Sequence, residues 1–184
     1  MDGAFTPLGI TVTLTAAAVD TRNGSLVDGL ARTPDSAAFK HLSMLATWFS
    51  KPGHEHCAIA FLHKSQEFIN ADDMDVLDKH FALANHCSVF YRWRDSVPGA
   101  LEGAIAACEM SIEMHERAAM AAKEFFGMIP AHACFRQLRI IEEKRGNFDR
   151  AIELCEMAKA GGWADDWDHA IARIEKKKAK AEAK

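Results

Sequence analysis

Histidine and cysteine side chains gather in one short segment of this 184-residue chain. His54, His56 and Cys57 lie almost side by side, and His63 follows His56 two helical turns later. Imidazole nitrogen and thiolate sulfur are ligands that zinc prefers. The usual zinc spacings are absent, because the sequence contains no CxxC pair and no HExxH motif. We therefore predict no metal site, with His54, His56 and Cys57 as the weak candidates.

The remaining polar residues point to no particular reaction. A cysteine beside a histidine can act as a nucleophile, but nothing in the sequence selects one of the five cysteines. Gly161-Gly162 is an isolated connector and not a phosphate-binding loop. We expect no catalytic residue and no cofactor, and a non-enzyme is favoured. A metal-dependent or cysteine-based enzyme built on the His/Cys cluster stays open as an alternative.

Composition narrows the class of protein. A net charge of −4 argues against a general nucleic-acid binder. No apolar run reaches the roughly 20 residues that cross a bilayer, so no membrane partner is expected. The acidic N-terminus, MDGAFTPL, lacks the basic flank of a signal peptide. An odd number of cysteines, mostly within helical patterns, favours reduced thiols and hence a cytoplasmic location.

The first 32 residues are the least helical part of the chain. Ile10, Val12 and Leu14 alternate with threonines, which is typical of a half-buried strand. Asn23-Gly24 is a strong turn dipeptide, and a short return strand could follow it. Residues 1–32 are therefore predicted to form a small β-hairpin or an extended docking arm, and the sequence does not decide between them.

Residues 33–184 carry helical periodicity throughout. Thr33-Pro34-Asp35 is typical of a helix start, and Phe39, Leu42 and Phe49 continue one apolar stripe. Further helices are expected at about 54–70, 74–94, 98–126, 131–145, 148–160 and 165–184. The fold class predicted from these patterns is all-α, built of antiparallel helical hairpins.

Two segments of the helical part resemble each other. Residues 135–160 contain, in order, an apolar stripe, the basic pair Lys144-Arg145, Gly146 as a helix end, and a second apolar stripe. Asn147 is placed to cap the second helix. Residues 104–110 read AIAACEM and residues 151–157 read AIELCEM. Such self-similarity is the signature of a repeat architecture.

This pattern resembles the tetratricopeptide repeat family. The resemblance lies in Leu138, in Gly146-Asn147-Phe148 at the turn, and in Ala151 and Ala158. It departs at Arg139 and Glu142, where the family has a small residue and an aromatic. The resemblance implies a tetratricopeptide-like superhelix with hairpins at about 74–126 and 131–160 and a capping helix at 165–184. A generic helical bundle is the competing interpretation.

The same resemblance implies a concave surface lined by the first helix of each hairpin. By register, that surface would consist of Asn85, Val89, Arg92, Trp93, Arg136, Ile140, Glu143 and Lys144. Arginine and tryptophan are common in binding hot spots. We therefore expect a non-catalytic module, such as an adaptor, assembly factor or inhibitor, that binds a protein or peptide. Self-association into a homodimer through residues 110–124, including Met114 and Ala118, is a further alternative.

Overall fold

The computed structural model describes residues 4–5, 12–13, 35–70 and 74–183. In this part of the chain the helices are α1 (Asp35–Phe49), α2 (Glu55–Gln66), α3 (Val76–Arg92), α4 (Ala100–Glu113), α5 (His115–Phe126), α6 (Ala133–Arg145), α7 (Phe148–Ala160) and α8 (Trp167–Glu182). The predicted all-α class is confirmed. Near the N-terminus, β1 (Ala4–Phe5) pairs antiparallel with β2 (Val12–Thr13). The turn predicted at Asn23-Gly24 lies outside the described residues.

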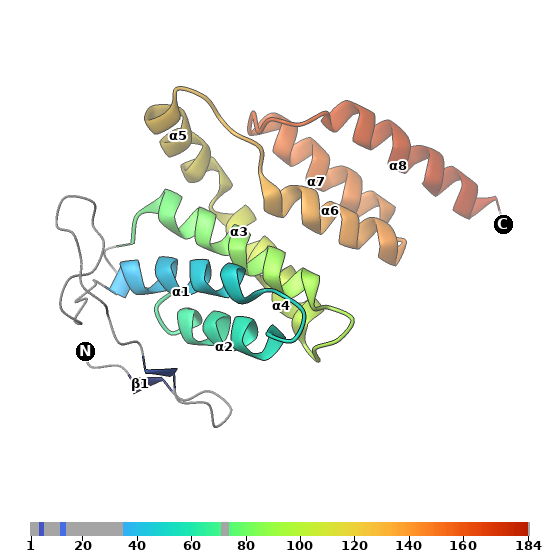
Figure 1. Cartoon of the computed structure of the whole chain (residues 1–184). Coiled ribbons are helices and arrows are strands. Elements are labelled where there is room, and N and C mark those ends of the chain that lie inside the picture. The colour runs from blue at the N-terminus through green and yellow to red at the C-terminus, as the bar shows by residue number, and fades with distance from the viewer. Residues whose placement is uncertain (1–3, 6–11, 14–34, 71–73, 184) are drawn as a thin grey trace.

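Neighbouring helices pack in chain order. α1 packs on α2, α3 on α4, and α6 on α7, while α8 covers α7 (Figure 1). The pairs are stacked because α3 also contacts α1, and α6 also contacts α4 and α3. This is the hairpin array that the sequence predicts, whereas membership of the tetratricopeptide family stays a prediction.

The turn between α6 and α7 agrees with the sequence-based prediction at Gly146 and differs from it at Asn147. Gly146 has φ +81°, as expected for a glycine that ends a helix. Asn147 occupies the N-cap position of α7, as predicted, but its side chain does not make the predicted capping hydrogen bond and donates to Glu142 Oε2 at 2.6 Å instead. Glu142 is only 8% exposed, and a buried carboxylate needs hydrogen-bond donors. The Asn147 side chain supplies one of them.

The single helix predicted over residues 98–126 is in fact two helices. The chain leaves helical geometry at Met114, with φ −103° and ψ 8°, and α5 then turns to pack on α3. Ala118, Ala119 and Ala122 form the buried side of α5. Their small side chains permit a close approach between helices, so the alanine-rich run contacts α3 and does not extend α4.

The core has two parts that share α3. The larger part includes Phe135, Leu138 and Ile174, and the smaller one includes Leu62 and Phe90. Over the residues that the structure describes, no helix combines the length and apolarity needed to cross a bilayer.

Candidate functional site

The residues predicted to line a binding surface on α3 mainly contact the first hairpin. Val89 is 2% exposed and belongs to the core. The Arg92 guanidinium donates to the backbone carbonyl of Ser50, and Trp93 Nε1 donates to the hydroxyl of Ser50 at 3.1 Å. Asn85 is half-buried. Arg92 and Trp93 therefore attach the connection between α1 and α2 to the end of α3.

The predicted residues on α6 contact its other neighbours. Arg136 pairs with Asp165 at 2.9 Å, and Lys144 donates to the hydroxyl of Tyr91 on α3 at 3.0 Å. Glu143 accepts two hydrogen bonds of 2.7 Å from Arg173 of α8. Ile140 is half-buried.

The eight predicted residues thus lie mostly at the contacts between neighbouring members of the series α1, α3, α6 and α8. We call them the first-helix surface. Of the eight, the exposed side chains are those of Arg92, Arg136 and Lys144. Each of the three already contacts another residue of the chain. Binding through this surface would have to compete with those contacts.

Exposed aromatic side chains gather at the end of α5. Phe125 and Phe126 are 76% and 48% exposed, and Phe81 of α3 is 43% exposed. The ring centroids of Phe125 and Phe126 lie 4.9 Å apart, and those of Phe126 and Phe81 lie 6.2 Å apart. These three residues form one continuous surface, called here the aromatic surface.

The packing of α5 explains why this surface is left open. Phe125 and Phe126 follow Ala122 by three and four residues, so they continue the side of α5 that is buried against α3. Figure 1 shows α5 above α3, at the edge of the molecule. Met120 is 66% exposed but lies on the opposite side of the helix, given the angle of about 100° per residue. The aromatic surface is not among the sites predicted from the sequence, although two phenylalanines before Gly127, which ends α5, were a signal.

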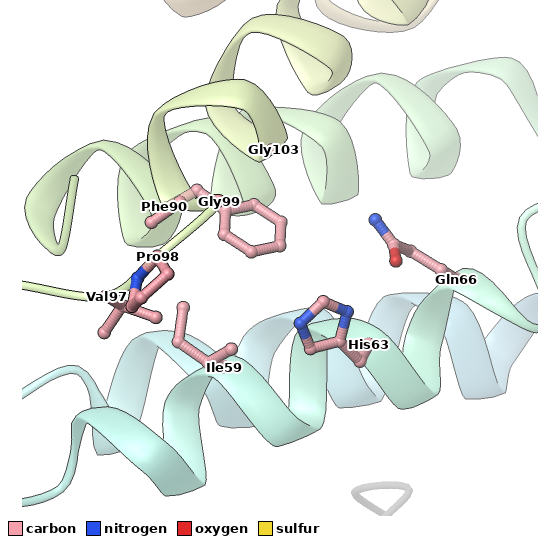
Figure 2. A pocket seen from close by; sticks show the side chains of 9 residues that line it. Ile59, His63, Gln66, Phe90, Val97, Pro98, Gly99 and Gly103 are labelled. Atoms are coloured by element: carbon pink, nitrogen blue, oxygen red, sulfur yellow. The ribbon is translucent and has the colours of Figure 1, made fainter.

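A small apolar pocket lies between α2 and the start of α4. Its volume is about 120 Å³, and its walls include Ile59, His63, Phe90 and Val97 (Figure 2). Pockets for small organic ligands usually reach about 300 Å³ or more. This pocket is therefore not assigned a ligand.

The weak metal candidates do not form a ligand set. His54 and His56 are exposed and Cys57 is half-buried. Among the described residues, three metal-ligating side chains come within reach of one another only at Cys87, Cys108 and Cys134. The sequence alone does not predict that these three cysteines meet, since they lie on three different helices.

Comparisons with protein-family models, with curated proteins and with solved structures found no match for this chain.

Proposed function

We propose that this protein is a non-catalytic interaction module that binds a protein partner through the aromatic surface. The observation that carries the proposal is the exposure of Phe81, Phe125 and Phe126 as one contiguous group. Contiguous apolar surfaces on folded proteins commonly mark interaction sites. Phenylalanine and methionine are enriched in interface cores, and the exposed Met128 lies two residues beyond Phe126.

The edge of the aromatic surface suits a polar interface rim. Lys123 and Glu124 are exposed beside the phenylalanines and carry opposite charges. Interfaces commonly surround an apolar centre with such polar residues. The partner we propose is a protein segment that presents apolar side chains to Phe125 and Phe126.

The first-helix surface is the alternative binding site within the same proposed function. Its support is the stacking of hairpins in chain order and the exposure of Arg136 and Lys144. A cytoplasmic location belongs to the proposal as well, because all five cysteines are free thiols and four of them are buried.

Self-association is better tested at the aromatic surface than at the predicted Ala/Met segment. Ala118 is 0% exposed, so a charge placed there would disrupt folding before it affected any dimer. Met114 is half-buried. A second copy of the chain is therefore an outcome that the experiment on Phe125 must distinguish from a different partner.

The test is site-specific photo-crosslinking in host cells. A photoreactive phenylalanine analogue replaces Phe125, Met120 or Arg136 in separate variants. We expect a crosslink to a different protein from position 125 and none from position 120, which is equally apolar and lies on the same helix. The change Phe125→Asp should abolish complex formation, whereas Met120→Asp should not.

Other crosslinking results would contradict this proposal. A crosslink from position 136 alone would indicate that the partner binds to the first-helix surface. A crosslink of position 125 to a second copy of this chain, with a dimer in sedimentation analysis, would indicate self-association. Equal crosslinking from positions 125 and 120 would show that the aromatic surface has no specific role.

A further inference from the structure

Three buried cysteine thiols meet where α3, α4 and α6 pack together. Cys87, Cys108 and Cys134 are each 2% exposed or less, and their sulfur atoms all lie within 4.8 Å of one another. The thiol of Cys108 donates to the sulfur of Cys87 at 3.2 Å. We call this group the thiol cluster. Buried cysteines are common as single packing residues, but convergence from three helices needs a further reason.

The sulfur positions suit one metal ion. Metal–thiolate bonds are about 2.3 Å long, so three sulfurs in a plane around one ion lie about 4.0 Å apart. The sulfur atoms of the thiol cluster lie within 4.8 Å of one another, and two of them are 3.2 Å apart, so the cluster has the size that one ion requires.

The surroundings of the cluster favour a charged sulfur. The neighbouring thiols of Cys108 and Cys87, against the opposing effect of burial, lower the pKa of the Cys134 thiol well below its usual value. Ser111 also contributes to lowering the pKa of this thiol, and the Ser111 hydroxyl lies 3.3 Å from Nδ1 of His80. A hydroxyl and an imidazole behind a sulfur ligand are the kind of outer contacts that orient metal-binding side chains.

The number and type of ligands select the ion. No carboxylate or imidazole among the described residues joins the three sulfurs as a fourth ligand at the same distance. Zinc sites are almost always four-coordinate, and a site this deeply buried has little access to water. Soft thiolate ligands select Cu(I), which is stable with three sulfur neighbours. We propose that Cys87, Cys108 and Cys134 bind a single Cu(I) ion in a three-coordinate site.

Binding involves no oxidation or reduction. Up to three S–H bonds break, three Cu–S bonds form, and the protons leave to the buffer or to nearby bases. Three thiolates and one Cu(I) carry a net charge of −2, which is costly in a protein interior.

A Cu(I) ion bound at this site would also stabilise the folded protein. The three ligands belong to three helices, and α6 is the first helix of the next hairpin. An ion that binds only the folded chain stabilises it by a free energy that rises with the logarithm of the ion's concentration relative to its dissociation constant. Cu(I) should therefore raise the melting temperature of the whole helical array.

The experiment uses reduced protein under argon, titrated with Cu(I) held as its bicinchoninate complex. The protein is tested both as folded and when refolded from urea with the complex present, so that burial does not prevent loading. A Cys57→Ser background removes the half-buried thiol outside the cluster. We expect one copper ion per chain, with a decrease of about 100-fold or more in affinity in Cys87→Ala and Cys134→Ala.

Cys155→Ala is the matched control, because Cys155 is a fully buried thiol outside the cluster. It should keep the copper ion and the copper-induced rise in melting temperature. X-ray absorption on the loaded background protein should show three sulfur neighbours, and this measurement does not depend on any cluster variant folding. No transfer of copper, retention of copper in Cys134→Ala, nitrogen or oxygen neighbours, or bound Zn²⁺ that Cu(I) cannot displace would each overturn the proposal.

Discussion

Glu143 of α6 and Arg173 of α8 face each other through two parallel hydrogen bonds of 2.7 Å. The Glu143 side chain is 7% exposed, and Lys177 forms a second ion pair with it. The two-pronged geometry of an arginine–carboxylate pair adds both strength and direction. This pair positions the last helix on the hairpin that precedes it.

The first prediction concerns the acid stability of this contact. The hydrogen bond from Arg173, against the opposing effect of burial, and the hydrogen bond from Lys177 lower the pKa of Glu143 from 4.5 to about 2. A carboxyl with a lowered pKa stabilises the fold fully above pH 4.5, and this contribution is lost as the pH falls toward 2. Because Arg173 is partly exposed and screened by solvent, we expect about 1 to 2 kcal/mol.

Urea unfolding at pH 6 and pH 3 measures the effect of Glu143. The Glu143→Gln variant should be less stable than the wild type at pH 6 and should lose less stability between the two pH values. Glu153→Gln is the control, since Glu153 forms an exposed ion pair with Arg150. If Glu143→Gln and the wild type had parallel pH profiles, the ion pair would not contribute to stability.

The second prediction tests the link between the first hairpin and α3. Ser50→Ala removes the oxygen that accepts from Trp93 Nε1, and Trp93→Phe removes the donor. Each change should lower the free energy of unfolding by about 1 kcal/mol, the usual net value of one such hydrogen bond. In a double-mutant cycle the two losses should not add, because they remove the same contact. Circular dichroism in urea measures all four proteins, and fully additive losses would contradict the contact.

The link between the first hairpin and α3 also changes how substitutions in the first-helix surface are interpreted. If Arg92 met a partner, as the sequence predicts, reversing its charge would affect binding and not melting. The bond from Arg92 to the carbonyl of Ser50 predicts instead that Arg92→Glu lowers the melting temperature. Helical periodicity placed Arg92 on the correct helix, but its contact comes from a connection that is distant in sequence.

Much of the fold was predictable because its signals are local. The glycine at position 146 and the apolar stripes on either side of it specify a helix, a turn and a helix without reference to other elements. The break at Met114 was not predictable, because the alanines that follow suit a continuous helix equally well. What bends the chain there is the packing of α5 on α3, which is a tertiary contact.

The candidate sites were less predictable than the helices. Periodicity identifies one side of α5 as apolar, but it does not indicate that α3 covers Ala122 and leaves Phe125 exposed. In the same way, Cys108 could be assigned to the interior from its position in the repeated segment. To predict its contact with Cys87, one must also know how α3 and α4 are aligned.

The third prediction concerns the close approach of α4 to α3. A Cβ atom added at Gly103 would lie 3.0 Å from the buried ring of Phe90. Alanine favours a helix over glycine by about 1 kcal/mol, yet we expect Gly103→Ala to be destabilising by about 1 to 2 kcal/mol because the ring has little room to move. Adding Phe90→Leu should reverse part of the loss due to the alanine. Thermal unfolding of the three variants tests this, and a Gly103→Ala protein more stable than the wild type would contradict it.

The fourth prediction is a pH dependence centred on His86 of α3. Its Nε2 atom lies 2.7 Å from the Ser65 hydroxyl of α2 and 3.0 Å from the Ser43 hydroxyl of α1, so one imidazole joins three helices. Burial, with a smaller effect from the charge of His63, lowers the pKa of His86 from 6.5 to about 4. The unfolded chain therefore binds a proton that the folded chain rejects, and stability falls as the pH decreases from 6.5 to 4.

The contribution of His86 to this decrease should be about 2 to 3 kcal/mol. Urea unfolding across this pH range should show a shallower decrease in His86→Gln, whose amide can still bond to the two hydroxyls but does not titrate. At pH 7.5, above the range in which His86 titrates, the variant should differ from the wild type mainly through packing. Burial also lowers the pKa of His132, to about 3, so the variant should keep a residual acid sensitivity. Burial also lowers the pKa of His80 on α3, so an unchanged profile in His86→Gln would place the acid-sensitive group at His80 or at His132, which caps the start of α6, and not at the contact of His86 with α1 and α2.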